Sequence, residues 1–294
     1  GGLAGDQSIS LFDQQPKHLN DNVRTDLGRL AVRHAPSADE EWIAAFSRQR
    51  ISNRSLQHNN LDDPVLGSYS IDYDFRPQLL TRDLELLYSR QGGGSSLILG
   101  LRQFKLSGSS RNSLIFCCFF SSSPLVSDSV DNQQNSRRSI FGYGQWSLEN
   151  RVTLHGGAEY VRYTDQDYTH VERLNGKLGL SFRPATGTTL RAAVFQGVKG
   201  AKYDQENLEP TQFVGFNQSF DDFNGSRWTR TALAVDQHFV GGIRAGLELA
   251  RRRIDIPNVG CDSADCLTRW YESVHRAYLV WPFGHHAVLS AEWR

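Results

Sequence analysis

Two stretches near the middle of the chain decide the fold: Arg151-Val-Thr-Leu-His-Gly-Gly-Ala-Glu-Tyr160 and Leu174-Asn-Gly-Lys-Leu-Gly-Leu-Ser-Phe-Arg183. In both, apolar or small residues alternate with polar or charged ones, so Leu178 and Lys177 belong to opposite faces. A helix would spread these charges around its circumference, whereas a strand sends successive side chains to opposite sides. The alternation therefore predicts two strands, each with one apolar and one polar face.

The same alternation recurs along the chain and predicts about fourteen strands, most of them 9–13 residues long. Ordinary strands have about 5–6 residues, whereas a tilted strand that crosses a bilayer needs about 9–11. The predicted strand lengths therefore favour a transmembrane sheet. The strands are predicted at 26–35, 41–53, 66–75, 81–90, 95–107, 112–122, 137–148, 151–163, 171–183, 189–198, 227–239, 243–255, 269–281 and 287–294.

The predicted connections fall into a short class and a longer, more polar class that largely alternate. Short turns on one rim and long loops on the other are typical of outer-membrane barrels, where the short turns are periplasmic. We therefore interpret 199–226 as a single long outer loop. The short connections are 36–40, 76–80, 108–111, 149–150, 184–188, 240–242 and 282–286, and the longer ones are 54–65, 91–94, 123–136, 164–170, 199–226 and 257–268.

These features predict an all-β chain, an antiparallel transmembrane β-barrel of a bacterial outer membrane. One domain is expected over residues 1–294, with an N-terminal segment and loop at 1–25 and barrel strands over 26–294. A soluble propeller or sandwich is the alternative, but such folds use shorter strands around an apolar core. If the 149–150 turn is periplasmic, both ends of the chain lie outside. Since bacterial barrels keep both termini in the periplasm, we expect a piece of a barrel of sixteen or more strands.

Composition and motifs exclude several classes of function. Lys+Arg and Asp+Glu both number 32, and this zero net charge argues against a nucleic-acid partner, which calls for a basic surface. The sequence contains no Gly-x-Ser-x-Gly or His-Glu-x-x-His motif, so we expect no enzyme. No phosphate-binding loop or cofactor motif is present either, and we expect no metal and no cofactor.

Charged residues of both signs lie on the predicted lumen face, where side chains of a wide barrel line water and set selectivity. The alternative is that they pair across strands and hold the wall in shape. Their mixed signs argue against strong selectivity for anions or cations. The pore-lining candidates are Asp72, Asp74, Glu85, Arg102, Arg151, Glu159, Lys177, Arg183, Arg191, Arg230, Asp236, His238, Arg244, Glu248 and Arg252.

Two further motifs lie toward the outer side. In Cys261-Asp-Ser-Ala-Asp-Cys266, a disulfide between Cys261 and Cys266 suits an oxidising surface compartment. A metal pair is the alternative, although the two aspartates fall short of the oxygens that Ca²⁺ needs. The run Arg251-Arg-Arg253 has the chemistry to bind lipopolysaccharide phosphates, because guanidinium groups bind them bidentately. An exposed, solvated cluster is the other interpretation of this run.

A family resemblance rests on Thr189-Leu-Arg-Ala-Ala-Val-Phe-Gln196, on Leu208-Glu-Pro-Thr-Gln212 and on Gly246-Leu-Glu-Leu-Ala-Arg-Arg252. With the intervening Gly215-Phe-Asn-Gln218, Phe220-Asp-Asp222 and Asn224-Gly225, these stretches resemble the barrel region of bacterial outer-membrane proteins that carry tetratricopeptide repeats. That barrel in turn is similar to the C-terminal strands of TonB-dependent receptors. There, a Leu-x-Pro-Glu-type segment of an extracellular loop precedes a strand, and Thr211 stands where the Glu is expected.

The resemblance implies a conduit for a large or polar solute, with polysaccharide as one candidate. A structural scaffold with a filled lumen that anchors partner proteins is the main alternative, and a receptor-like transporter is a third. Expected partners are outer-membrane lipid and lipopolysaccharide, together with other outer-membrane or periplasmic proteins.

Overall fold

The computed structural model describes residues 18–63, 67–117, 125–149, 151–166, 169–201, 208–258, 266–283 and 287–294. Its described part contains twelve strands in one antiparallel sheet and a separate two-stranded hairpin. The sheet strands are β1 (His18–Ser37), β2 (Glu40–Asp63), β3 (Gly67–Gly92), β4 (Ser95–Cys117), β5 (Leu125–Leu148), β6 (Val152–Asp165), β7 (Thr169–Ala185), β8 (Thr188–Val198), β11 (Arg227–His238), β12 (Arg244–Pro257), β13 (Leu267–Phe283) and β14 (Ala287–Trp293).

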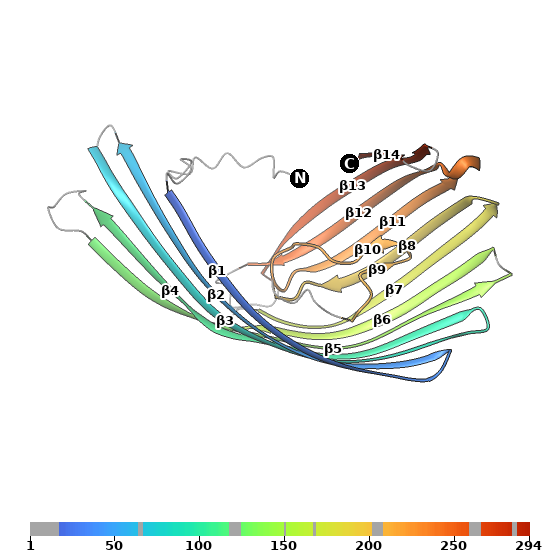
Figure 1. Cartoon of the computed structure of the whole chain (residues 1–294), viewed down its shortest axis with the longest axis horizontal. Helices are drawn as coiled ribbons and strands as arrows, with labels where there is room; N and C mark the ends of the chain where they lie inside the picture. The colour runs from blue at the N-terminus through green and yellow to red at the C-terminus, as the bar shows by residue number, and fades with distance from the viewer. Residues whose placement is uncertain are drawn as a thin grey trace. The chain divides into compact units, whose positions relative to one another are not determined.

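Strand order follows chain order throughout the sheet, with β1 and β14 at its edges, and Figure 1 shows the strands side by side. The hairpin consists of β9 (Gln212–Phe213) and β10 (Phe216–Asn217), and a short 3-10 turn η1 (Val240–Gly242) follows β11. In the part of the chain that the structure describes, no helix is long and apolar enough to cross a membrane. The all-β prediction is confirmed.

Two predicted turns are wrong, which reduces fourteen predicted strands to twelve. Residues 76–80 lie within β3, and residues 108–111 lie within β4. Pro77 and Gly108 suggested breaks, but both residues lie within continuous strands, where Pro77 is buried and Gly108 half-buried. Gly108 is required by space, because a Cβ there would lie 2.2 Å from the carbonyl oxygen of Gln78. Most of the predicted loops 54–65 and 123–136 is also strand.

The connections range in length from two residues, as at 38–39, to the long segment 199–226. The glycines of the 91–94 segment, although we placed it among the longer connections, predict a hairpin turn. Only Gly93 and Gly94 separate β3 from β4, and both have positive φ, as such a turn requires. Strands β2 to β5 have 23–26 residues, about twice the length that a bilayer crossing needs.

Two compact units divide the chain. Unit 1 consists of residues 1–28, 48–81 and 106–134, and unit 2 consists of 29–47, 82–105 and 135–294. In unit 1 the facing strands are linked by polar contacts, such as the bond from Tyr73 Oη to Asn112 Oδ1 at 3.3 Å. All of β6 to β14 belongs to unit 2, which therefore carries most of the sheet.

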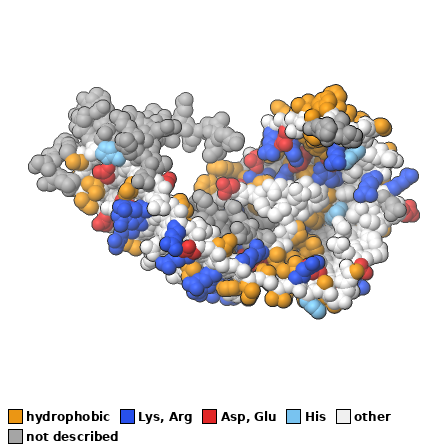
Figure 2. Space-filling view, in the orientation of Figure 1, with side chains coloured by type: hydrophobic (Ala, Val, Ile, Leu, Met, Phe, Trp, Pro, Cys, Tyr) orange, Lys and Arg blue, Asp and Glu red, His pale blue; other side chains and the backbone are white. Residues whose placement is uncertain are grey.

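Unit 2 has the burial pattern of a membrane wall, with charged side chains inside and apolar ones outside. Lys177 is 3% exposed and Glu159 is 2% exposed, whereas Leu178 is 65% exposed and Leu174 is 66% exposed. In Figure 2 hydrophobic side chains reach the surface of this unit in patches, beside scattered basic and acidic ones. Because lipid would cover the apolar face, we call it the lipid face and the opposite one the lumen face.

Candidate functional site

The segment between β8 and β11 forms the most elaborate structure on the lumen face. Its described residues are 199–201 and 208–226, and we call these the inner loop. The sequence predicted a long outer loop here, but the segment folds back against lumen-facing side chains of unit 2. Figure 1 shows it, with β9 and β10, lying over the sheet. Charged residues on the lumen face bind the segment, and the alternation within single strands does not predict such contacts.

The hairpin of the inner loop turns at two residues with positive φ, Val214 (53°) and Gly215 (76°). Positive φ at both central positions is typical of a type I′ turn. A β-branched residue is a genuine outlier there, and such strain persists only where surrounding contacts hold it. One such contact comes from Arg191, whose Nη1 donates to the Val214 carbonyl at 2.9 Å. A Cβ on Gly215 would lie 2.3 Å from the same nitrogen and displace the guanidinium, and the positive φ also favours glycine here.

The hairpin fits because the wall beneath it is lined with small residues. Phe213 and Phe216 are buried against lumen-facing alanines of three adjacent strands. Phe213 packs on Phe195, with ring centroids 5.7 Å apart, and Phe195 meets Trp228 edge-on at the same distance. The alanines leave room for these rings, and burial of the rings stabilises the loop through the hydrophobic effect. The alanines are Ala193, Ala232, Ala234 and Ala250.

A buried ionic cluster holds the start of the loop. The Lys177 ammonium of β7 lies 3.4 Å from Glu209 Oε1 and donates to Tyr143 Oη at 2.8 Å. It also donates to Gln218, while the Tyr143 hydroxyl donates to Glu209. The ammonium lies 4.4 Å from the Tyr143 ring centroid, within cation–π range. Four side chains from two strands and the loop therefore satisfy one another's hydrogen bonds.

Arginines of β11 and β12 hold the end of the loop. Arg252 forms a bidentate pair with Asp222, at 2.6 and 3.0 Å, and its guanidinium lies 3.9 Å from the Phe220 ring centroid. Arg230 donates to the Asn217 carbonyl at 3.1 Å and to Glu248 at 2.7 Å. Such bidentate, charge-assisted bonds are among the strongest in proteins.

One contact within the loop and one more to the wall complete the arrangement. Lys199 Nζ, at the start of the loop, donates to the Phe220 carbonyl at 2.7 Å. The Leu208 amide donates to Glu85 Oε2 of β3 at 2.6 Å. The inner loop is thus bound from β3, β5, β7, β8, β11 and β12. A cavity of about 390 Å³ remains beside it, lined by charged residues that include Arg137, Glu159, Lys177 and Lys199.

The pKa of Glu209 links loop docking to pH. Burial opposes its charged form, but Lys177, Arg137 and the Tyr143 hydrogen bond outweigh burial and hold the pKa below its usual 4.5. A carboxyl whose pKa is lower when folded stabilises the docked state above the unfolded pKa. That contribution is lost as the pH falls through the folded pKa.

We therefore expect docking of the inner loop to weaken on acidification below about pH 4.5. Trp228 fluorescence reports it, because Phe220 lies 5.3 Å from the Trp228 ring. The signal is taken as the difference between the full-length protein and its Trp228→Phe variant. Glu209→Gln is the control and should remove the acid transition. An unchanged transition in that variant would assign it to another carboxyl.

The structure brings seven of the predicted pore-lining residues to the inner loop or to its direct partners. Two others, Arg102 and Asp236, are also on the lumen face, where Arg102 pairs with Asp83 at 3.1 Å and Asp236 pairs with Arg191 at 2.7 Å. Their role in lining a pore stays a prediction. The seven are Glu85, Glu159, Lys177, Arg191, Arg230, Glu248 and Arg252.

The remaining candidates lie elsewhere. Asp72 and Asp74 belong to unit 1, where they pair with His58 and with Arg54 and Arg76. The other candidates lie exposed beside the short turns of unit 2 and do not contact the inner loop; they are Arg151, Arg183, His238 and Arg244.

Sequence reasoning missed Tyr143, Glu209, Gln218, Phe220 and Asp222 as members of the site. All of them except Tyr143 carried a signal, because they lie in stretches of 208–222 on which the family resemblance rests. Cys266 is disulfide-bonded, but Cys261 lies outside the described residues, so their mutual pairing stays a prediction. Among the residues described, no group of three or more His, Cys, Asp or Glu side chains is arranged to hold a metal ion.

Comparison with protein families gives the assignment. The profile of the family described as TonB dependent receptor-like, beta-barrel, matches residues 2–235. The chain belongs to this family. TonB-dependent receptors reside in the bacterial outer membrane and are transporters rather than enzymes, in agreement with both predictions. No curated protein matches the sequence.

Solved structures of TonB-dependent receptors share the fold at low sequence identity. The ferric yersiniabactin uptake receptor FyuA from Yersinia pestis has a TM-score of 0.63 and 12% identity over 90% of this chain and 41% of its own. The ferric preacinetobactin receptor BauA from Acinetobacter baumannii has a TM-score of 0.57 and 10% identity, over 92% of this chain and 44% of its own. The ferric-catecholate import receptor Fiu from K12 E. coli has a TM-score of 0.56 and 11% identity, over 88% of this chain and 45% of its own.

The chain spans less than half the length of these receptors. Outer-membrane transporters of this kind close about 22 strands around a plugged lumen. The twelve strands of the sheet match part of such a barrel. This agrees with the prediction that the chain is a piece of a barrel of sixteen or more strands. The resemblance to barrels of tetratricopeptide-repeat proteins is not among these matches and stays an interpretation.

Proposed function

We propose that this TonB-dependent receptor barrel forms part of the wall of an importer for metal chelates, and that the inner loop narrows its lumen. The observation that carries the proposal is the inner loop itself, which presents charged and aromatic groups on the lumen face. The similar structures named above are receptors for ferric chelates by their descriptions. A chelate combines charged and apolar surface, and the groups beside the 390 Å³ cavity complement both kinds.

An uptake experiment tests this function. Cells that lack their own ferric-chelate receptors and express the full-length protein are expected to grow on at least one of three chelates: a catecholate, a yersiniabactin-type chelate or ferric citrate. Deletion of TonB should abolish this growth. Equal growth without TonB would identify a passive conduit for polar solutes instead.

A scaffold with a filled lumen is the second candidate. The docked inner loop favours it, because a loop bound from six strands fills space along the wall. The conductance of the full-length protein in a planar bilayer, combined with the result of the uptake assay, distinguishes the candidates. Steady, large conductance would favour an open conduit for a solute or polymer. Silence combined with TonB-dependent uptake supports the importer, and silence without uptake of any chelate supports the scaffold.

A further inference from the structure

The run Arg251–Arg253 divides between the two faces of β12. Arg252 is 6% exposed and holds the inner loop on the lumen face. Arg251 and Arg253 point the other way and are exposed on the lipid face. Residues two apart on a strand lie about 7 Å from each other, so the lipid face carries two guanidinium groups close together. Neither of them takes part in the site described above.

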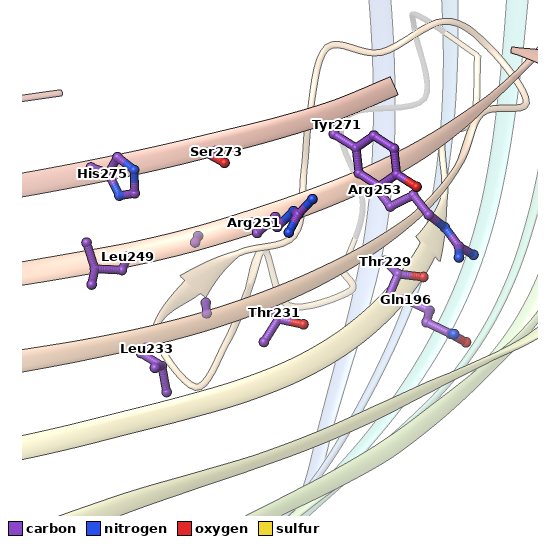
Figure 3. A pocket seen from close by; sticks show the side chains of 12 residues that line it. Gln196, Thr229, Thr231, Leu233, Leu249, Arg251, Arg253, Tyr271, Ser273 and His275 are labelled. Atoms are coloured by element: carbon purple, nitrogen blue, oxygen red, sulfur yellow. The ribbon is translucent and has the colours of Figure 1, made fainter. Parts of the chain in front are cut away.

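These two arginines line a groove of about 720 Å³ that crosses four adjacent strands, β8, β11, β12 and β13. Figure 3 shows Arg251 and Arg253 together with Thr229, Tyr271 and the other lining residues. The described lining residues are polar or basic toward the outer end of β12, and none of them is acidic. Arg251 lies 5.3 Å from the Tyr271 ring centroid, and Arg253 lies 3.6 Å from Asp255.

The other end of the groove is lined by Leu233 and Leu249, with His275 beside Leu249, and continues into a second groove of about 640 Å³. The two grooves share Thr231, Ala232 and Leu233, and Leu178 and Val194 line the second one. Leu233 is 57% exposed. A ligand that fills both grooves therefore has an anionic head beside the arginines and hydrocarbon chains along the leucines.

We infer that this double groove binds a phosphorylated glycolipid of the outer leaflet, the lipid A part of lipopolysaccharide. Arg251 and Arg253 receive a phosphate, because guanidinium groups donate parallel hydrogen bonds to two of its oxygens. Thr229, Ser273 and Gln196 offer hydroxyl and amide groups to the sugar. The acyl chains follow Leu233 and Leu249 into the bilayer. The inference does not depend on what the barrel transports.

Binding is tested with the full-length protein in phosphatidylcholine nanodiscs, titrated with bisphosphorylated lipid A and followed by native mass spectrometry. The expected result is saturable binding of lipid A, at least about tenfold weaker for the R251Q/R253Q variant, since each lost charge-assisted bond is worth roughly a factor of ten. R251K/R253K keeps the charges without the bidentate geometry and should bind with intermediate affinity. R90Q is the matched control, because Arg90 is an exposed arginine at the opposite rim.

Two further probes make the test independent of the variants. Dephosphorylated lipid A should bind the unmodified protein at least about tenfold more weakly than the phosphorylated form, by the same reasoning. Inorganic phosphate should compete only weakly, because it lacks the acyl chains. Equal binding of both lipids, or of R251Q/R253Q and R90Q, would overturn the inference. Full displacement of lipid A by equimolar phosphate would assign the groove to free phosphate instead.

Discussion

Replacement of Lys177 by leucine is expected to release the inner loop. It would leave Glu209 buried without the ammonium 3.4 Å away. Removal of one partner from a buried ion pair costs about 3–5 kcal/mol, and the charge of Arg137 nearby places this case toward the lower end. About 3 kcal/mol corresponds to roughly a hundredfold change in the opening equilibrium. Hydrogen exchange of the peptide 208–220 in the full-length protein should accelerate by that factor.

Two variants control this experiment. Lys105→Leu makes the same substitution at an exposed lysine of β4 and should leave exchange of 208–220 unchanged. The double variant Lys177→Leu/Glu209→Leu removes both charges, and replacement of a buried pair by apolar residues is close to neutral. Protection should therefore return in the double variant. Slow exchange in Lys177→Leu alone would show that the aromatic contacts hold the loop without the ion pair.

Replacement of Leu178 by arginine, one residue further on, is expected to block membrane assembly rather than loop docking. Leu178 lies on the lipid face and is 65% exposed, so an arginine there would meet hydrocarbon. Near the bilayer midplane this costs about 2–4 kcal/mol. The measurement is the fraction of heat-modifiable, folded barrel that the full-length protein forms in lipid vesicles.

The matched control is Leu148→Arg, the same substitution at the end of β5 beside a short turn. The cost of a cation falls to about 0–1 kcal/mol near the interface, so this variant should assemble almost normally. Leu178→Ile should assemble like the unmodified protein. Equal assembly of Leu178→Arg and Leu148→Arg would mean that the lipid face has been assigned to the wrong side of β7.

Local periodicity was enough to predict the fold class and the two faces of the wall. Lys177 and Leu178 illustrate why: neighbouring residues on a strand must point apart, so their chemistry reveals their environment. Periodicity failed where Pro77 and Gly108 mimic turn signals inside long strands. The neighbouring strands accommodate both residues without a break, and those neighbours are distant in sequence.

The inner loop could not be predicted by the same means. Its attachment depends on pairs such as Lys177 with Glu209 and Arg252 with Asp222, which lie 32 and 30 residues apart. No rule of spacing joins such residues before the sheet forms. A signal was nevertheless present, because the lumen-facing alanines of β8, β11 and β12 break the charged pattern. Small apolar residues on a face that should meet water indicate that something else covers it.

The alternation within β7 also constrains how this sequence can change its length. Gain or loss of one residue between Asn175 and Leu180 would exchange the two faces for the rest of the strand. The loop-binding ammonium would then enter lipid, and a leucine would replace it beneath Glu209. A single extra residue is accommodated only where a bulge absorbs it, as between Phe182 and Ala185 of β7, where the pairing with β8 shifts by one residue. Paired insertions preserve the faces and lengthen the wall. A wall built in this way grows taller in steps of two residues unless a bulge intervenes.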